Sequence, residues 1–114
     1  MPQDWNNLEG VQATERIVRA AVSNGASEVH ISSDTDGATV LFMSAHNMEF
    51  FAQLPAECKD RVLAYLRVLG SIDAWESTPV SGVGTFAGED HECQLEIRLL
   101  KSDHGENAVI RISK

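Results

Sequence analysis

Positive charge is scarce in this 114-residue sequence. Nine Lys and Arg residues stand against 17 Asp and Glu residues, which gives a formal net charge of −8 at pH 7. Binding to nucleic acid or to an anionic membrane surface requires clustered Lys and Arg, because phosphate groups must be neutralised. We therefore expect no nucleic-acid partner. The acidic balance suits a basic protein partner, although solubility alone also explains it.

Long apolar runs are absent as well, and the first seven residues contain neither a basic region nor an apolar core. The sequence therefore predicts no signal peptide and no membrane insertion. Only two cysteines are present, Cys58 and Cys93, without C-x-x-C spacing and with apolar neighbours. We expect buried, reduced thiols in a cytoplasmic protein, while the sequence leaves a disulfide between them open.

What is present fits a single globular domain over residues 1–114. Apolar residues make up 43% of the chain. A chain of this length buries roughly two thirds of its unfolded surface, which is enough to fold without disulfides or a structural metal. No segment has the composition of a linker or of a low-complexity region.

A first helix is predicted from about Leu8 to Asn24, where apolar residues recur at helical spacing. Asn6 or Asn7 is the expected cap at its start. Gly25 is expected to end it, because glycine tolerates the left-handed conformation that follows many helices.

A second helix is predicted to begin at Pro55, a favoured first-turn residue, and to end at Gly70-Ser71. Its buried face is expected to carry Cys58, Val62, Leu66 and Leu69. Its solvent face is expected to carry Lys59, Asp60 and Arg67.

Six strands are predicted, most of them from apolar residues that alternate with polar ones. They cover about residues 29–31, 38–44, 48–54, 80–88, 93–99 and 108–112. In the third strand, one face is expected to carry Met48, Phe50, Ala52 and Leu54. The glycines of residues 80–88 predict a bent or bulged strand.

Short turns between consecutive strands imply antiparallel hairpins, because parallel pairing needs a long crossover. We therefore expect an α+β domain, in the order helix, three strands, helix, three strands, with both helices on one face of an antiparallel sheet. Hairpin edges leave room for a homodimer.

No motif with a defined chemistry is complete. Residues 81–88 are glycine-rich but lack the Gly-Lys-Ser/Thr ending of a phosphate loop, and Asp34–Gly37 fits a hairpin turn better than a calcium loop. The four histidines show no metal-ligand spacing, and no nucleophile can be matched with a base. We expect no metal, no cofactor and no enzyme activity.

Two groups of residues are candidates for binding a partner. Glu89, Asp90 and Glu92 form a local acidic spot that would dock Lys or Arg, although a solvated face is the default interpretation. Trp5 and Trp75 lie in irregular segments, where an aromatic side chain either fills the core or anchors a partner. Filling the core is the favoured prediction, and Trp75 is kept as a partner-binding candidate.

The segment Gly25–Ile31, Gly-Ala-Ser-Glu-Val-His-Ile, resembles a motif of the secretion ATPases of type II secretion and type IV pilus assembly. In that family, Gly-Ala-Ser-Asp, a hydrophobic residue, His and another hydrophobic residue occur in the domain before the motor. Residues 66–74, Pro79, His104–Glu106 and Arg111 fit the same frame, so the resemblance covers nearly all of residues 8–113. The resemblance implies an α/β, PAS-like fold.

The chain departs from the family pattern at its arginines. Leu41 and Met43 stand at the positions of two strand arginines, and Glu76 and Ser77 stand at an Arg-Arg pair. The resemblance implies that such arginines reach nucleotide on the motor. Apolar and acidic side chains cannot donate to phosphate, so the departures argue against ATP hydrolysis and add Glu76 to the partner-binding candidates.

The function predicted from the sequence is a non-catalytic protein-binding or regulatory module, associated with type II secretion or type IV pilus machinery. Its expected partner is a secretion or pilus component. Two alternatives stay open: a PAS-like domain that senses a small molecule, and a fragment of a longer secretion ATPase.

Overall fold

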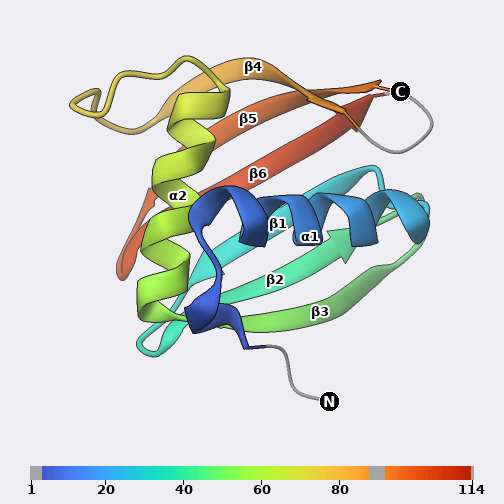
Figure 1. The fold of residues 1–114 in the computed structure, drawn as a ribbon, viewed down its shortest axis with the longest axis horizontal. Coiled ribbons are helices and arrows are strands. Elements are labelled where there is room, and N and C mark those ends of the chain that lie inside the picture. The colour runs from blue at the N-terminus through green and yellow to red at the C-terminus, as the bar shows by residue number, and fades with distance from the viewer. Residues whose placement is uncertain (1–3, 88–91, 114) are drawn as a thin grey trace.

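A computed structural model describes residues 4–87 and 92–113 of the chain. It is an α+β structure with two α-helices and one six-stranded antiparallel sheet (Figure 1). In chain order its elements are the 3₁₀-helix η1 (Trp5–Asn7), α1 (Gly10–Ser23), β1 (Glu28–Ser33), β2 (Gly37–Met43), β3 (Met48–Pro55), α2 (Ala56–Leu69), β4 (Val80–Ala87), β5 (Glu92–Ser102) and β6 (Gly105–Ser113).

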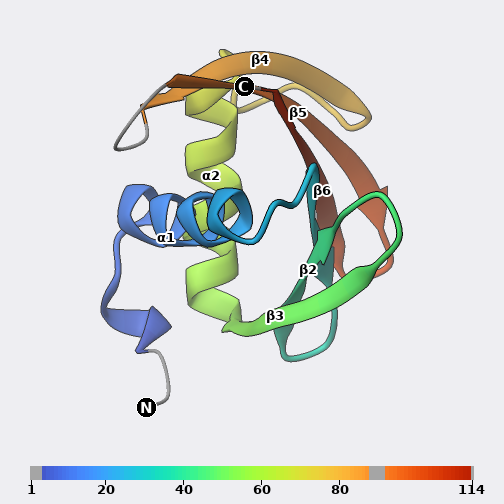
Figure 2. The ribbon, with the colours of Figure 1, turned by 90° about the vertical axis from the view of Figure 1, so that its right-hand side faces the viewer.

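The strands lie side by side in the order β3-β2-β1-β6-β5-β4. Each group of three consecutive strands is joined by hairpins, as short turns require. The two groups meet where β1 pairs with β6, for example at Glu28 and Arg111. Both helices pack on the same face of this sheet (Figure 2).

The core lies between that face and the helices. Strand β5 shows the predicted alternation without exception, since Cys93, Leu95, Ile97 and Leu99 are all buried. The same holds for Ala108, Ile110 and Ile112 of β6. Both cysteines are buried free thiols, so no disulfide joins them.

Helix α1 begins differently from the prediction. Its cap is Glu9, whose backbone N–H donates to the side chain of Gln12 at 2.9 Å, while Asn6 and Asn7 belong to η1. This reciprocal arrangement is a capping box, which satisfies backbone donors at the helix start. The predicted end is confirmed, since Gly25 has a φ of +72°.

Strand β3 contains a β-bulge that reverses the predicted faces of its first half. The register with β2 shifts between Val40 and Leu41, which leaves Phe51 as the extra residue. Phe51 therefore turns inward and stacks on Phe42, with ring centroids 4.5 Å apart. Phe50 turns outward, because each extra residue moves the preceding side chains to the other face.

Two basic residues of α2 are not in solvent, contrary to the prediction. Lys59 is buried, and its ammonium donates to the carbonyl of His104 at 3.3 Å. Arg67 donates to the Glu106 carboxylate at 2.7 Å and to the carbonyl of Asp73 at 2.8 Å. Both long side chains are covered because α2 lies beside the turn between β5 and β6. Asp60, the third residue predicted for the solvent face, is exposed.

The glycines of β4 do not bulge it, since its register with β5 is unbroken, while the strand curves along its length (Figure 2). A Cβ atom at Gly82 would lie 2.1 Å from the carbonyl oxygen of Gly70, and one at Gly84 would lie 2.3 Å from that of Leu69. These glycines therefore let the end of α2 rest directly on the strand.

Candidate functional site

The sheet face opposite the helices is the candidate site, and we call it the open face. In the described part of the chain no helix crosses it (Figure 2). Since successive side chains of a strand point to opposite sides, the residues between the core positions all lie on this face. They form two regions, a charged groove and an apolar cluster.

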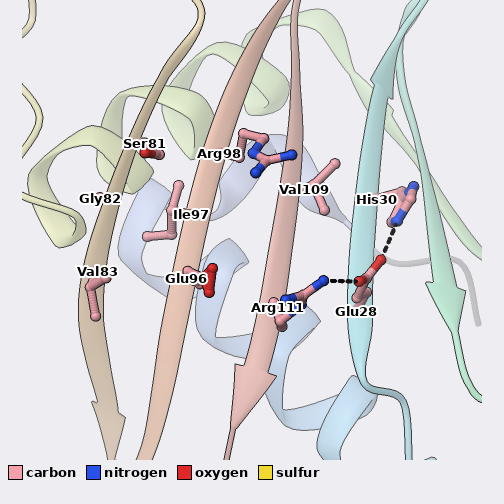
Figure 3. A pocket seen from close by; sticks show the side chains of 10 residues that line it. All are labelled: Glu28, His30, Ser81, Gly82, Val83, Glu96, Ile97, Arg98, Val109 and Arg111. Carbon is pink, nitrogen blue, oxygen red and sulfur yellow. Dashed lines mark hydrogen bonds and ion pairs between the residues drawn. The ribbon is translucent and has the colours of Figure 1, made fainter.

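The charged groove crosses β1, β6, β5 and β4 and has a volume of about 590 Å³. Its outward side chains include Glu28, His30, Glu96, Arg98, Val109 and Arg111 (Figure 3). The strand register places Glu28 beside Arg111, and Arg111 beside Glu96, in one row across three strands. Acidic and basic groups therefore alternate along this row.

Glu28 has two side-chain partners in the groove. Its carboxylate accepts a hydrogen bond from His30 Nε2 at 2.9 Å and one from Arg111 Nη2 at 3.4 Å (Figure 3). The bond from His30, and then the charges of His30 and Arg111, hold the pKa of Glu28 below its usual value. An ionised carboxylate with two donors is a positioning or binding group and has no proton to give at neutral pH.

The apolar cluster occupies the neighbouring end of the open face, on β2 and β3. It consists of Leu41, Met43, Met48 and Phe50. Leu41 pairs with Phe50 across the two strands, and Met43 pairs with Met48. Phe50 is 64% exposed and Met48 is 61% exposed. The cluster adjoins the groove, because His30 and Glu28 are the β1 partners of Leu41 and Met43.

Sequence reasoning missed this cluster. It placed Met48 and Phe50 on the same face as Ala52 and Leu54, which are indeed buried. The bulge at Phe51 separates the two pairs. The adjacent aromatic residues Phe50 and Phe51 were the one available signal, since two large apolar neighbours cannot both face inward on a regular strand.

The predicted partner-binding residues lie apart from one another. Trp75 is 81% exposed, so the prediction that it fills the core is wrong; the same prediction is confirmed for Trp5, which is 4% exposed. Glu76 is exposed in the same segment between α2 and β4. Glu92 is exposed at the far end of β4, opposite Ala87. Glu89 and Asp90 lie outside the described residues.

Trp75 and Glu92 are too far apart to form one site. The segment that holds Trp75 enters β4 at Val80, whereas Glu92 pairs with the last residue of that strand. An eight-residue strand spans roughly 25 Å. Glu92 and Trp75 thus belong to separate surfaces.

The polar groups of the turn between β1 and β2 are satisfied within the chain. The Asp34 carboxylate accepts hydrogen bonds from the Gln53 amide, the Asp36 backbone and the Thr39 hydroxyl, and these bonds lower its pKa. This is a closed hairpin turn. Burial raises the pKa of the Cys58 thiol, which keeps it protonated and unreactive.

Two features are absent from the described residues. No group of three or more His, Cys, Asp or Glu side chains within residues 4–87 and 92–113 is arranged to hold a metal ion. Nor does either helix in that part of the chain have the length and apolar character to cross a membrane.

Comparison with known proteins gives one distant similarity. No family model matches the sequence. The chain is similar to the type IV pilus assembly ATPase TfpB of Acinetobacter baylyi, with 26% identity over 111 residues. The match covers 96% of this chain but 19% of the ATPase, so the chain spans less than a fifth of the length of this relative. The similarity thus supports a relationship to one part of a pilus ATPase.

Proposed function

We propose that this chain is a non-catalytic protein-binding module that works with type IV pilus or type II secretion machinery. Its similarity along 96% of its length to part of a pilus assembly ATPase supports the cellular system. The composition of the open face supports the mode of action. The proposal concerns residues 4–113 wherever they occur, alone or within a longer chain.

The observation that carries the proposal is the make-up of the apolar cluster. Leu41 and Met43 stand where the resembling domain of secretion ATPases carries arginines, and they lie beside the exposed Phe50 and Met48. Neither side chain can donate to phosphate. Exposed apolar groups that adjoin one another are typical of protein-binding surfaces. With Leu41 and Met43 in place of the two arginines, this surface is suited to binding protein and not to binding nucleotide.

The surroundings of the cluster fit the same role. Protein interfaces combine a desolvated apolar centre with a polar rim. Phe50, on the edge strand β3, is the large anchor of the cluster, and Glu28 and His30 supply the rim along the β1 side. Because Glu28 is already held by His30 and Arg111, the rim needs little reordering when a partner arrives.

Absence of catalysis is part of the proposal. A nucleophile, an adjacent base and oxyanion donors must converge for acyl or phosphoryl transfer. The polar side chains that line the groove carry carboxylates, guanidinium groups, one imidazole and the Ser81 hydroxyl, and the Glu28 carboxylate accepts from both His30 and Arg111. We expect titration with Mg-ATP to give no saturable binding; tight, magnesium-dependent binding would contradict the proposal.

A PAS-like sensor is the second class that the sequence left open. It would hold a small molecule between sheet and helices, where Ile17, Leu66 and Leu95 are fully buried. The charged groove lies on the opposite side of the sheet. These observations favour the protein-binding role. A small-molecule adduct in a native mass spectrum of the purified chain would favour the sensor instead.

The direct test is affinity capture with three versions of the tagged full chain, from a lysate of the host organism. Phe50→Asp places a charge in the apolar cluster. Gln94→Asp adds the same charge on the open face of β5, outside the cluster, and is the matched control. We expect mass spectrometry to find a pilus or secretion protein with the original chain and with Gln94→Asp, and not with Phe50→Asp. Equal capture by all three, or no such protein with any, would contradict the proposal.

A further inference from the structure

Lys59 carries a charge that the fold buries without an opposite charge to balance it. It is 9% exposed, and among residues 4–87 and 92–113 it is the one charged residue that is buried. Its ammonium has three donors, and the structure gives it a single acceptor, the His104 carbonyl at 3.3 Å. That distance exceeds the usual range of about 2.7–3.2 Å. Lysine is seldom buried unless it is paired, because a desolvated charge is costly.

Lys59 lines a cavity of about 530 Å³ beside α2. The walls come from α2, from the segment after α2 and from the start of β6. The turn between β5 and β6 lies on the side of α2 away from α1 (Figure 1). At the start of β6, a Cβ atom on Gly105 would lie 3.6 Å from the Lys59 Nζ. Because glycine has no side chain, the space next to the ammonium stays open to the cavity.

The two carboxylates that line the same cavity do not balance this charge. The Glu106 carboxylate lies 2.7 Å from the Arg67 guanidinium, so these two charges neutralise each other. Asp60 follows Lys59 in α2 and is exposed, and adjacent residues of a helix do not face each other. Within the described ranges, Lys59 therefore has a neutral carbonyl as its partner and no ion pair.

We propose that this cavity binds a small organic acid, whose carboxylate takes the remaining donors of Lys59 and whose short apolar chain lies against α2. The inference concerns a surface other than the open face and does not rest on the proposed function. Water can occupy the remaining donors but cannot neutralise the charge. A carboxylate does both, and its charge-assisted hydrogen bonds are among the strongest in proteins.

The other side chains of the cavity favour an acid with one carboxylate and an apolar chain. Leu63 and Ile72 are buried beneath the cavity. Val68 also lines it and is 72% exposed, so an apolar chain that covers Val68 removes apolar surface from water. A second negative charge on the ligand would be repelled by Asp60. We therefore expect monocarboxylates to bind better than dicarboxylates or phosphate.

The cavity is formed before a ligand arrives, because Arg67 joins its three walls. From α2, the Arg67 guanidinium donates to the Glu106 carboxylate at 2.7 Å and to the Asp73 carbonyl at 2.8 Å. Little reordering is then needed on binding. One ion pair with a few apolar contacts gives a dissociation constant on the order of 1 mM. The acid would thus exchange freely and be lost on purification, unlike the retained ligand of an interior sensor pocket.

The first test is titration of the isotope-labelled full chain with sodium butyrate, followed by two-dimensional NMR at constant ionic strength. Butyramide, the uncharged amide of the same carbon chain, is the matched control ligand. We expect butyrate to give saturable shifts at residues 59–74 and 104–106, and butyramide to bind at least roughly tenfold more weakly. No saturable shift with butyrate, equal binding of butyramide, or shifts confined to the open face would overturn the proposal.

The second test removes the charge from the cavity. Lys59→Met keeps a long side chain but cannot donate to a carboxylate, so we expect it to lose the butyrate shifts. Lys101→Met removes an exposed lysine outside the cavity, is the control, and should bind butyrate as the original chain does. Circular dichroism checks that each variant is folded. Undiminished binding by Lys59→Met, or an equal loss in Lys101→Met, would overturn the assignment. If Lys59→Met does not fold, the comparison of butyrate with butyramide on the original chain still decides.

Discussion

The two faces of one sheet have opposite compositions in this protein. The face toward the helices is mostly apolar, and Val29, Val40, Leu95, Ile97 and Ile110 are all fully buried there. The open face carries an alternating row of charges and, beside it, four apolar side chains that stay partly or largely exposed. The covered face accounts for folding. The open face is free to vary, because its side chains contribute little to the core.

The largest expected difference between the faces comes from neighbouring residues of β5. Ile97 is fully buried, and Arg98 is exposed on the open face. Ile97→Ala should lower the free energy of unfolding by about 2–5 kcal/mol, because it leaves a cavity. Arg98→Ala should change it by less than about 0.5 kcal/mol. Urea unfolding measures both, and comparable losses would remove the distinction between the faces.

The next effect concerns the contact between α2 and β4. A methyl group at Gly82 would meet the backbone of Gly70 at 2.1 Å, so the helix end or the strand must move. Gly82→Ala should cost about 1–3 kcal/mol of stability, the usual range for overpacking. Thr85→Ala, on the open face of the same strand, is the control and should change stability by less than about 0.5 kcal/mol. If the two melting temperatures fall equally, close approach is not the reason for the glycine.

An effect of similar size separates Phe50 from Phe51, which the bulge sends to opposite faces. Phe51 stacks on Phe42 and meets the Trp5 ring edge-on at 6.3 Å. Phe51→Ala should cost about 1–3 kcal/mol, less than a fully buried phenylalanine because the ring is half-buried. Phe50→Ala should be nearly neutral for folding. A larger loss for Phe50→Ala in chemical denaturation would mean that the bulge is wrongly placed.

The smallest effect is a pH dependence on the open face. The folded-state pKa of Glu28 is lowered from 4.5, chiefly by the hydrogen bond from His30. Its contribution to stability is therefore complete above the unfolded-state pKa and is lost as the pH falls through the lower folded-state value. The stability difference between the original chain and Glu28→Gln should shrink below pH 4.5. A difference that stays constant from pH 7 to pH 3 would show that the bond from His30 does not stabilise the ionised form.

The sequence predicted the covered face well wherever the strands are regular. Strict alternation in β5 and β6 identified every buried residue of their cores, and Gly25 marked the end of α1. Alternation along a strand and the end of a helix are set by residues that are close together in the chain, so both can be read from the sequence.

The failures within the sheet and along α2 arose where distant parts of the chain meet. The bulge in β3 depends on its register with β2, so Phe50 was assigned to the wrong face. Lys59 and Arg67 are covered by the turn between β5 and β6, which lies about 40 residues away in sequence. The glycines of β4 accommodate the end of α2. The pairing of β1 with β6 that joins the two halves likewise has no local signal.

The central claim is that the open face, and not the helical side, contacts a partner protein. Amide hydrogen exchange of the chain, free and in complex with the pilus or secretion protein that it captures, tests this most directly. We predict that protection increases along β2 and β3, where the apolar cluster lies, and stays unchanged along α1. Increased protection confined to the helices, with β2 and β3 exchanging as in the free chain, would contradict the account.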